Sequence, residues 1–363
     1  MNGVLIIDKP AGLTSHDVVN RVRRILQQRS VGHLGTLDPM ATGVLPLVIG
    51  TLTRLAQFYA TSEKVYEGAI RFGFATDTYD AEGEPTTAPQ EVILRANEVE
   101  SAAARFRGVI EQTPPPFSAK KIHGIPAYKL ARQQKEVVLK PVQVEIKEFV
   151  ILGVEKDHVR FRARVASGTY MRSVAHEMGR ELAGGAHLES LRRVSVAEFN
   201  LADAHTLEQL AEAAQHLSSP DETLKENHVS RSDASLERTH ECGSDANRGR
   251  IDESVHAASP GGTTDGSPPV VLTGTQPSNE PRSVGTPERL EYLFVHPRKL
   301  LPDLPSVTVD DLTAARIRNG RTVNLSDLSR ARQVKVFSGQ KELIAIATRV
   351  AGTLFHPKIV LRG

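Results

Sequence analysis

The sequence has little from which a disulfide-bonded, membrane-spanning or zinc-binding protein could be built. It contains one cysteine, Cys242, in 363 residues, which excludes a disulfide framework and a cysteine-based zinc site. No apolar run is long enough to cross a bilayer, and the amino terminus lacks the charged region and cleavage site of a signal peptide. We therefore expect a cytoplasmic protein with no membrane partner.

A strong excess of charge of one sign is also missing. The chain has 45 Lys and Arg against 43 Asp and Glu, which gives a formal net charge of +2. Overall charge therefore gives no argument for nucleic-acid binding, and basic side chains have to be considered locally. The length suggests at least two domains, and 39% apolar residues suffice for a sizeable core.

Hydrophobic periodicity predicts strands in neighbouring runs with helices interspersed. This order favours an α+β fold, with a mixed, largely antiparallel sheet and flanking helices, over a doubly wound sheet. Two helices have capping pairs at their starts, Thr14 with Asp17 and Thr206 with Gln209. The strands span residues 4–8, 44–49, 64–74, 142–154 and 158–166, and the helices span 15–28, 96–107 and 206–217, with another beginning near residue 170.

The composition changes sharply after the last of these helices. Residues 218–287 are rich in Ser, Asp, Glu, Gly and Pro and have too few apolar side chains to offset the entropy of ordering. We therefore predict a catalytic domain over 1–217, a disordered polar insertion over 218–287 and a small β-rich domain over 288–363. VKVFSG, ELIAIATRV and HPKIVLRG are its expected strands, and VDDLTAARIRNG its expected helix.

The segment GHLGTLDPMATG, residues 32–43, can hold one carboxylate rigidly at the floor of a cleft. Its glycines allow tight bends and close approach of the backbone, and Pro39 biases Asp38 towards an extended conformation. By itself, an Asp-Pro pair is more typical of an ordinary turn. A phosphate-binding loop is disfavoured because the Gly-Lys-Ser/Thr ending is absent.

The chain contains, in this order, the blocks GVLIIDKPAGLTSHDVV, VGHLGTLDPMATGVLPL, KVYEGAIRFGFATDTYDAEGE, QTPPPFSAKKIHGIPAYKLAR and SGTYMRSVAHEMGRELAGGAHLESLRRV. Together these five blocks resemble the TruB-type tRNA pseudouridine-55 synthases over nearly all of residues 1–215. The resemblance implies the pseudouridine synthase fold with a PUA-like RNA-binding domain at the carboxyl end. It also implies a monomer that flips uridine 55 out of the T-stem-loop of tRNA and isomerises it to pseudouridine. That reaction needs no cofactor and no metal, and the sequence lacks HExxH, paired CxxC and dinucleotide-binding motifs.

The resemblance assigns the chemistry to Asp38, the family's catalytic carboxylate. It acts either by covalent attack or by steering a proton abstraction that yields a glycal intermediate. Tyr66 would stack on the flipped uracil, and Arg172 would form an ion pair that keeps Asp38 ionised. Tyr170 would line the same pocket. Without the resemblance, Tyr66 is typical of an aromatic residue that packs in the core from a strand, and Arg172 is typical of a solvated surface arginine.

Four further residues are expected around the substrate. Leu188 resembles the family's apolar pocket residue, and His33 would fill the space that the flipped nucleotide leaves; alone, His33 reads as a loop hydrogen-bonder. Lys9, in DKPAG, would support the Asp38 loop. Asp80 would contact the flipped RNA loop or else lie in a solvated turn.

Three groups of basic residues are candidate phosphate contacts. Each group alone is also compatible with a solvated surface. The first group resembles the family's thumb-like insertion that clamps the tRNA stem-loop. The groups are Lys120, Lys121, Lys129 and Arg132; Arg192 and Arg193; and Arg21, Arg23 and Arg24.

Two other functions compete with a stand-alone tRNA enzyme. One is an RNA-binding module or tRNA-folding chaperone without catalysis, against which the joint presence of Asp38, Tyr66 and Arg172 argues. The other is a related synthase with a different RNA target, such as the eukaryotic or archaeal rRNA-guided type, which acts in a protein complex. The chain's own thumb segment and carboxyl-terminal module favour the stand-alone enzyme.

Overall fold

The computed structural model describes residues 1–118, 120–122, 124–133, 137–182, 184–215, 287–325 and 331–361. Within residues 1–218 and 286–363 these parts form one compact unit. The insertion predicted over 218–287 lies outside the described residues, apart from Pro287. The boundaries between the three predicted segments stay predictions.

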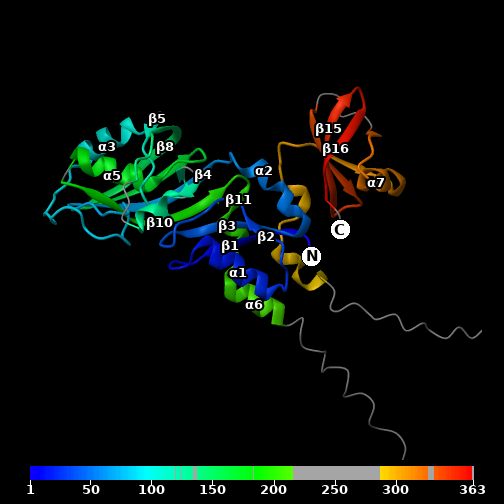
Figure 1. Ribbon diagram of the computed structural model, residues 1–363, viewed down its shortest axis with the longest axis horizontal. Helices are drawn as coiled ribbons and strands as arrows, with labels where there is room; N and C mark the ends of the chain where they lie inside the picture. Colours follow the sequence, from blue (N-terminus) through cyan, green and yellow to red (C-terminus); the bar gives the residue numbers. More distant parts are fainter. Residues whose placement is uncertain are drawn as a thin grey trace, which may run out of the picture. The chain divides into compact units, whose positions relative to one another are not determined.

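A nine-stranded sheet forms the centre of the amino-terminal part (Figure 1). Its order is β1-β3-β10-β4-β9-β8-β5, with β2 added to β3 and β11 added to β10. In the described part of the chain its pairings are antiparallel except between β3 and β10, which run parallel. The predicted mixed, largely antiparallel α+β fold is therefore confirmed. The strands are β1 (Gly3–Lys9), β2 (Val31–His33), β3 (Thr42–Ile49), β4 (Lys64–Phe72), β5 (Gly108–Gln112), β8 (Val142–Glu155), β9 (His158–Val165), β10 (Ala186–Val196) and β11 (Phe199–Asn200).

The helices cover the sheet with short apolar stripes. In α1 (Ser15–Ile25) Val18, Val19 and Val22 are buried, and the predicted capping box of Thr14 with Asp17 is present. The helix ends three residues before the predicted residue 28. Helix α5 packs on β10, α3 packs on β8 and α5, and α1 packs on α6 (Figure 1). Helix α3 spans Ala96–Arg105, α5 spans Met171–Leu182 and α6 spans Leu207–Gln215.

Shorter elements link these layers. A 3-10 helix, η1 (Gly50–Leu55), and α2 (Ala56–Tyr59) follow β3, and the 3-10 helix η2 (Leu201–Asp203) follows β11. The block QTPPPFSAKKIHGIPAYKLAR, residues 112–132, contains a hairpin followed by a short helix. The hairpin is β6 (Lys121–Ile122) with β7 (Ile125–Pro126), and the helix is α4 (Ala127–Ala131).

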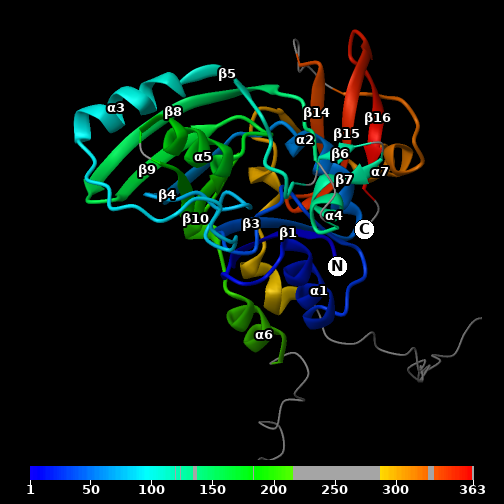
Figure 2. The same ribbon diagram turned by 60° about the vertical axis from the view of Figure 1, so that its left-hand side comes forward.

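The carboxyl-terminal module is a five-stranded sheet in the order β12-β14-β15-β16-β13. Helix α7 packs against it (Figure 2); Asp310 caps the start of this helix, and Gly320, with φ 73°, follows its end. The predicted β-rich module is confirmed. Its elements are β12 (Ser306–Val309), α7 (Asp311–Arg318), β13 (Val323–Asn324), β14 (Gln333–Ser338), β15 (Glu342–Ala351) and β16 (Leu354–Val360), preceded by the 3-10 helices η4 (Pro287–Leu293) and η5 (Pro297–Lys299).

No helix in the described part of the chain is long and apolar enough to cross a membrane.

Candidate active site

The loop between β2 and β3 carries Asp38, and its backbone is fixed on both sides of that residue. Ser15 at the start of α1 donates its hydroxyl to the Leu37 carbonyl (3.1 Å) and accepts from the Leu37 amide (2.8 Å). Lys9 at the end of β1 is fully buried, and its Nζ donates to the Pro39 carbonyl (3.0 Å). The loop is therefore held by β1 and α1, whose sequences are far from it in the chain.

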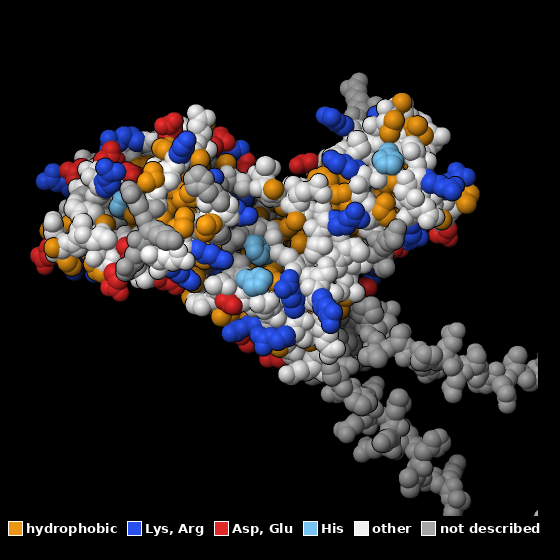
Figure 3. Space-filling view, in the orientation of Figure 1, with side chains coloured by type: hydrophobic (Ala, Val, Ile, Leu, Met, Phe, Trp, Pro, Cys, Tyr) orange, Lys and Arg blue, Asp and Glu red, His pale blue; other side chains and the backbone are white. Residues whose placement is uncertain are grey.

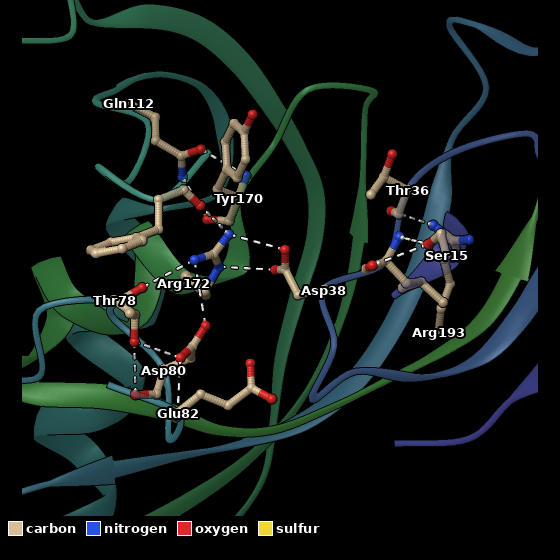
Figure 4. Close-up of polar contacts among 12 residues, drawn as sticks. Ser15, Thr36, Asp38, Thr78, Asp80, Glu82, Gln112, Tyr170, Arg172 and Arg193 are labelled. Carbon is tan, nitrogen blue, oxygen red and sulfur yellow. Dashed lines mark hydrogen bonds and ion pairs between the residues drawn. The ribbon is translucent and has the colours of Figure 1, made fainter. Parts of the chain in front are cut away.

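Arg193 on β10 also holds this loop (Figure 4). Its side chain is fully buried. Its guanidinium donates to the carbonyls of Gly35 (3.0 Å), Thr36 (3.2 Å) and Val44 (2.8 Å). A buried charge needs such partners to offset its desolvation. The prediction that Arg193 contacts RNA phosphate is wrong, because its side chain cannot reach solvent. Arg192 forms an ion pair with Asp8 (2.7 Å).

Gly43 lets β3 and β10 come close enough for this arrangement. The two strands pair in parallel, with Gly43 opposite Arg193. Gly43 has φ +99°, and a Cβ added to it would lie 2.2 Å from the Arg193 carbonyl oxygen. An L side chain is therefore excluded both by the backbone conformation and by the neighbouring strand.

Arg172, in the first turn of α5, forms a two-point contact with Asp38 (Figure 4). Its Nη2 donates to Asp38 Oδ1 (3.0 Å), and its Nε lies 2.9 Å from Asp38 Oδ2. The Arg172 side chain is 5% exposed and that of Asp38 is 34% exposed. The ion pair that the resemblance implied is present in the structure. The arginine is buried behind the carboxylate, which stays accessible.

The same guanidinium has three other partners. It donates to the carbonyls of Thr78 (3.1 Å) and Phe117 (3.0 Å) and lies 3.4 Å from Asp80 Oδ2. The Asp80 side chain is 4% exposed and accepts from the Thr78 hydroxyl (2.6 Å). The alternative that placed Asp80 in a solvated turn is therefore wrong, and Arg172 is shared by two carboxylates.

The proton affinity of Asp38 follows from this crowding. Burial raises the pKa of Asp38, the Arg172 cation opposes the rise, and the Asp80 charge adds to it. Burial also lowers the pKa of Lys9 to about 8. Glu82 lies near the same groups, and burial together with Asp80 and Asp38 raises its pKa. In the described chain, no group of three or more His, Cys, Asp or Glu could hold a metal ion.

Three predicted pocket residues come from elements around this pair. Tyr66, on β4, is 8% exposed and lies opposite Arg193 on β10. Tyr170 directly precedes α5; burial raises its pKa, and the charges of Arg172 and Asp38 act on it in opposite directions. Leu188, on β10, is fully buried. Sequence reasoning missed Gln112, whose side chain accepts from the Tyr170 amide (2.8 Å) and donates to the Tyr170 carbonyl (3.1 Å).

His33 is the last residue of β2, opposite Leu47, and not part of the loop in which the sequence placed it. Its side chain is half-buried. Within the described residues its Nδ1 is buried and has no hydrogen-bond partner. Burial and the charge of Arg193 lower the pKa of His33, so the imidazole is neutral at physiological pH.

The two remaining basic groups differ in exposure. The four residues of the thumb-like segment, Lys120, Lys121, Lys129 and Arg132, are exposed. On α1, Arg21 and Arg24 are exposed, whereas Arg23 is half-buried and donates to the Val31 carbonyl (2.9 Å). Figure 3 shows basic side chains on the same face as histidine side chains. Contact of these groups with RNA stays a prediction.

Family models and a full-length relative all assign the chain to one protein family. The model of the TruB family pseudouridylate synthase amino-terminal domain matches residues 23–171, and that of the tRNA pseudouridylate synthase B carboxyl-terminal domain matches residues 172–237. The tRNA pseudouridine synthase B of Solibacter usitatus (strain Ellin6076) is 42% identical over 364 residues, which cover 99% of this chain and all of the relative. The chain belongs to the TruB family of pseudouridylate synthases.

Another relative matches a shorter part of the chain, and a solved structure matches nearly all of it. The tRNA pseudouridine synthase B of Geobacter sulfurreducens (strain ATCC 51573 / DSM 12127 / PCA) is 45% identical over 215 residues, which cover 59% of this chain and 71% of the relative. Among solved structures, an H/ACA RNP bound to a substrate RNA containing 2'-deoxyuridine matches with a TM-score of 0.60 and 19% identity, over 99% of this chain and 85% of that one. This TruB family chain therefore shares the fold of that protein.

Proposed function

We propose that the protein converts uridine 55 in the T-loop of tRNA to pseudouridine, with Asp38 as the catalytic carboxylate. The observation that carries the proposal is the two-point contact between Asp38 and the buried Arg172. It occurs in a chain that is related over its full length to a tRNA pseudouridine synthase B. A carboxylate with one cationic partner and access to solvent suits chemistry at a sugar carbon.

The reaction breaks the C1′–N1 bond, turns the freed uracil and joins C5 to C1′. The proton leaves C5 and N1 gains one, so the atoms balance with no change of oxidation state. Asp38 either attacks C1′ or steers the proton abstraction that yields a glycal. Both routes need an ionised carboxylate at a fixed position. Arg172 supplies the positive charge, and the contacts of Ser15, Lys9 and Arg193 fix the loop.

The remaining residues bind the flipped nucleotide. Tyr66 stacks on the uracil, and Tyr170 and Leu188 line the pocket around it. His33 occupies the space that the nucleotide vacates and so offsets part of the cost of unstacking, which is a few kcal/mol. Its neutral, half-buried imidazole is suited to stacking between bases. Asp80 acts through Arg172, which it contacts.

The test uses purified protein, an unmodified tRNA transcript and chemical mapping of pseudouridine. We expect stoichiometric pseudouridine at position 55 and the same product in an isolated T-stem-loop. Asp38→Asn should bind the tRNA and form no product. Product at another position would reject the site assignment. Equal tRNA binding by wild type and variant, with no product from either, would favour the chaperone alternative.

A further inference from the structure

Two aromatic side chains, Tyr79 and His176, stack beside the residues that bind Arg172. Their ring centroids lie 3.8 Å apart and the ring planes differ by 11°. Both side chains are half-buried. Neither residue has a part in the chemistry proposed above. Parallel stacking at this distance is a specific contact that fixes the two rings relative to each other.

Tyr79 has a backbone conformation that L residues with large side chains seldom adopt. Its φ is 65°, in the left-handed region where the side chain crowds the following carbonyl. Backbone hydrogen bonds hold it there: its amide donates to the Thr76 carbonyl (3.3 Å), and its carbonyl accepts from the Leu188 amide (3.0 Å). Such residues persist only where the surroundings fix them, and they cluster at functional sites.

The residues on either side of Tyr79 are partners of Arg172. The Thr78 carbonyl accepts from Arg172 Nη1, and Asp80 forms the second ion pair of this guanidinium. Arg172 and His176 are four residues apart on α5, so their side chains lie on one face of the helix. The segment from Thr78 to Asp80 therefore contacts one face of α5 at two points, the Arg172 guanidinium and the His176 ring.

We propose that the Tyr79–His176 stack is a positioning device for Arg172. It holds the segment from Thr78 to Asp80 against α5, and the segment in turn orients the guanidinium towards Asp38. Tyr79 and His176 are then positioning residues, because they act through Arg172. The inference rests on the proposed catalytic role of Asp38 and deepens it.

The test removes the stack from either side and restores it. Tyr79→Asn keeps a residue that tolerates positive φ but lacks the ring, and His176→Ala removes the partner ring. Since small misplacements of a catalytic group cost rate and not affinity, we expect each to lower kcat about tenfold with the KM for tRNA within about twofold. Tyr79→Phe and His176→Phe each keep a stacked pair of rings, so their kcat should stay near that of the wild type.

A second set of variants shows whether the effect passes through the Thr78–Asp80 segment. In an Asp80→Asn background, His176→Ala should lower kcat by less than about twofold further, because coupled residues are not additive. A raised KM with unchanged kcat would overturn the proposal and make the stack an RNA contact. Unchanged kcat in both single variants would also overturn it. Should Tyr79→Asn fail to fold, His176→Ala decides. The wild-type rate and the loss in Asp38→Asn, measured alongside, test the proposed function separately.

Discussion

Arg172 is the residue through which the charges of the site act on one another. Asp38 has two contacts with its guanidinium at 3.0 Å or less, whereas Asp80 lies 3.4 Å away. Two carboxylates thus share one buried cation, and neither is fully neutralised. Because burial and the Asp80 charge both disfavour ionisation, the pKa of Asp38 is raised in spite of the Arg172 cation, and its carboxylate binds protons more readily than that of an ordinary aspartate.

Replacing Asp38 with asparagine should separate catalysis from stability. We expect Asp38→Asn to lose on the order of 10⁴-fold or more in rate, with tRNA affinity nearly intact. Its thermal midpoint at pH 7 should equal or exceed that of wild type. The folded-state pKa of Asp38 is raised, so its contribution to stability is present at low pH and lost as pH rises through that pKa. Single-turnover rates, filter binding and calorimetry measure the three quantities. A rate near wild type would show that another group is the catalyst.

The pH profile should report the influence of Asp80. Because burial and the Asp80 charge raise the pKa of Asp38, the acid limb of kcat/KM should lie above pH 3.8, the ordinary value of the group. Asp80→Asn should move this limb to lower pH while lowering the plateau. Glu84→Gln, at an exposed position of the same loop, is the matched control. A limb that stays in place in Asp80→Asn would mean that Asp80 does not affect the proton affinity of Asp38.

Single residues could be predicted where a local motif defines them. The sequence marks Asp38 by its glycines and proline, and the resemblance implied its pairing with Arg172, which the structure contains. Arg193 could not be predicted, since an Arg-Arg pair suggests a surface and burial of the second arginine depends on three carbonyls from a distant loop. For the same reason the pairing of Asp80 with Arg172 was missed: it joins residues far apart in the chain.

At the scale of secondary-structure elements, the close approach of β3 and β10 decides the position of the Asp38 loop. We expect Gly43→Ala to lower the free energy of unfolding by more than about 2 kcal/mol and to reduce kcat, because its Cβ would overlap the Arg193 carbonyl oxygen. Gly12 also has positive φ, but an added Cβ there meets nothing within 4 Å. Gly12→Ala should therefore cost only the backbone strain, about 1–2 kcal/mol. Denaturant unfolding of both variants checks this, and equal losses would show that the strand contact is unimportant.

Helices and strands with a regular spacing of apolar residues were predicted well. Strands in which this spacing is interrupted were missed. The valines of α1 and the alternation in β4 and β9 follow the expected spacings. Strand β10 was not predicted, because register shifts at Leu188/Ser190 and Arg193/Ser195 interrupt its alternation and because it buries an arginine. The strands of the hairpin β6–β7 have only two residues each, which is too short to show an alternation of apolar and polar residues.

At the scale of the whole molecule, a buried polar contact joins α2, the turn after β10 and the segment before the carboxyl-terminal module. Tyr59 donates its hydroxyl to Glu198 (2.6 Å), and the Leu301 amide donates to the same carboxylate oxygen (2.9 Å). Burial and Glu198 raise the pKa of Tyr59. The contact therefore persists across the physiological pH range.

This contact should contribute to stability and not to chemistry. We expect Tyr59→Phe to lower the free energy of unfolding by about 1 kcal/mol, the usual contribution of one hydrogen bond, with kcat unchanged. Glu198→Leu removes the acceptor of the Tyr59 hydroxyl and the shorter of the two acceptors of the Leu301 amide, which keeps only the Tyr59 oxygen (3.2 Å), so this variant should cost more. Urea unfolding and single-turnover kinetics on both variants give the comparison. A loss of kcat in Tyr59→Phe would link this contact to the active site.

The place of β10 in the sheet also has a consequence for how the protein is made. β10 enters between β3 and β4, both of which the ribosome produces long before it. Arg193 and the Thr36 carbonyl that it binds are 157 residues apart in the chain. Since domains generally fold as units, a nascent chain that stops short of β10 has the carboxylate, but it lacks the arginine that holds the Asp38 loop and the strand that joins β3 to β4. The ability to act on RNA thus arises only after the growing polypeptide has passed Val196.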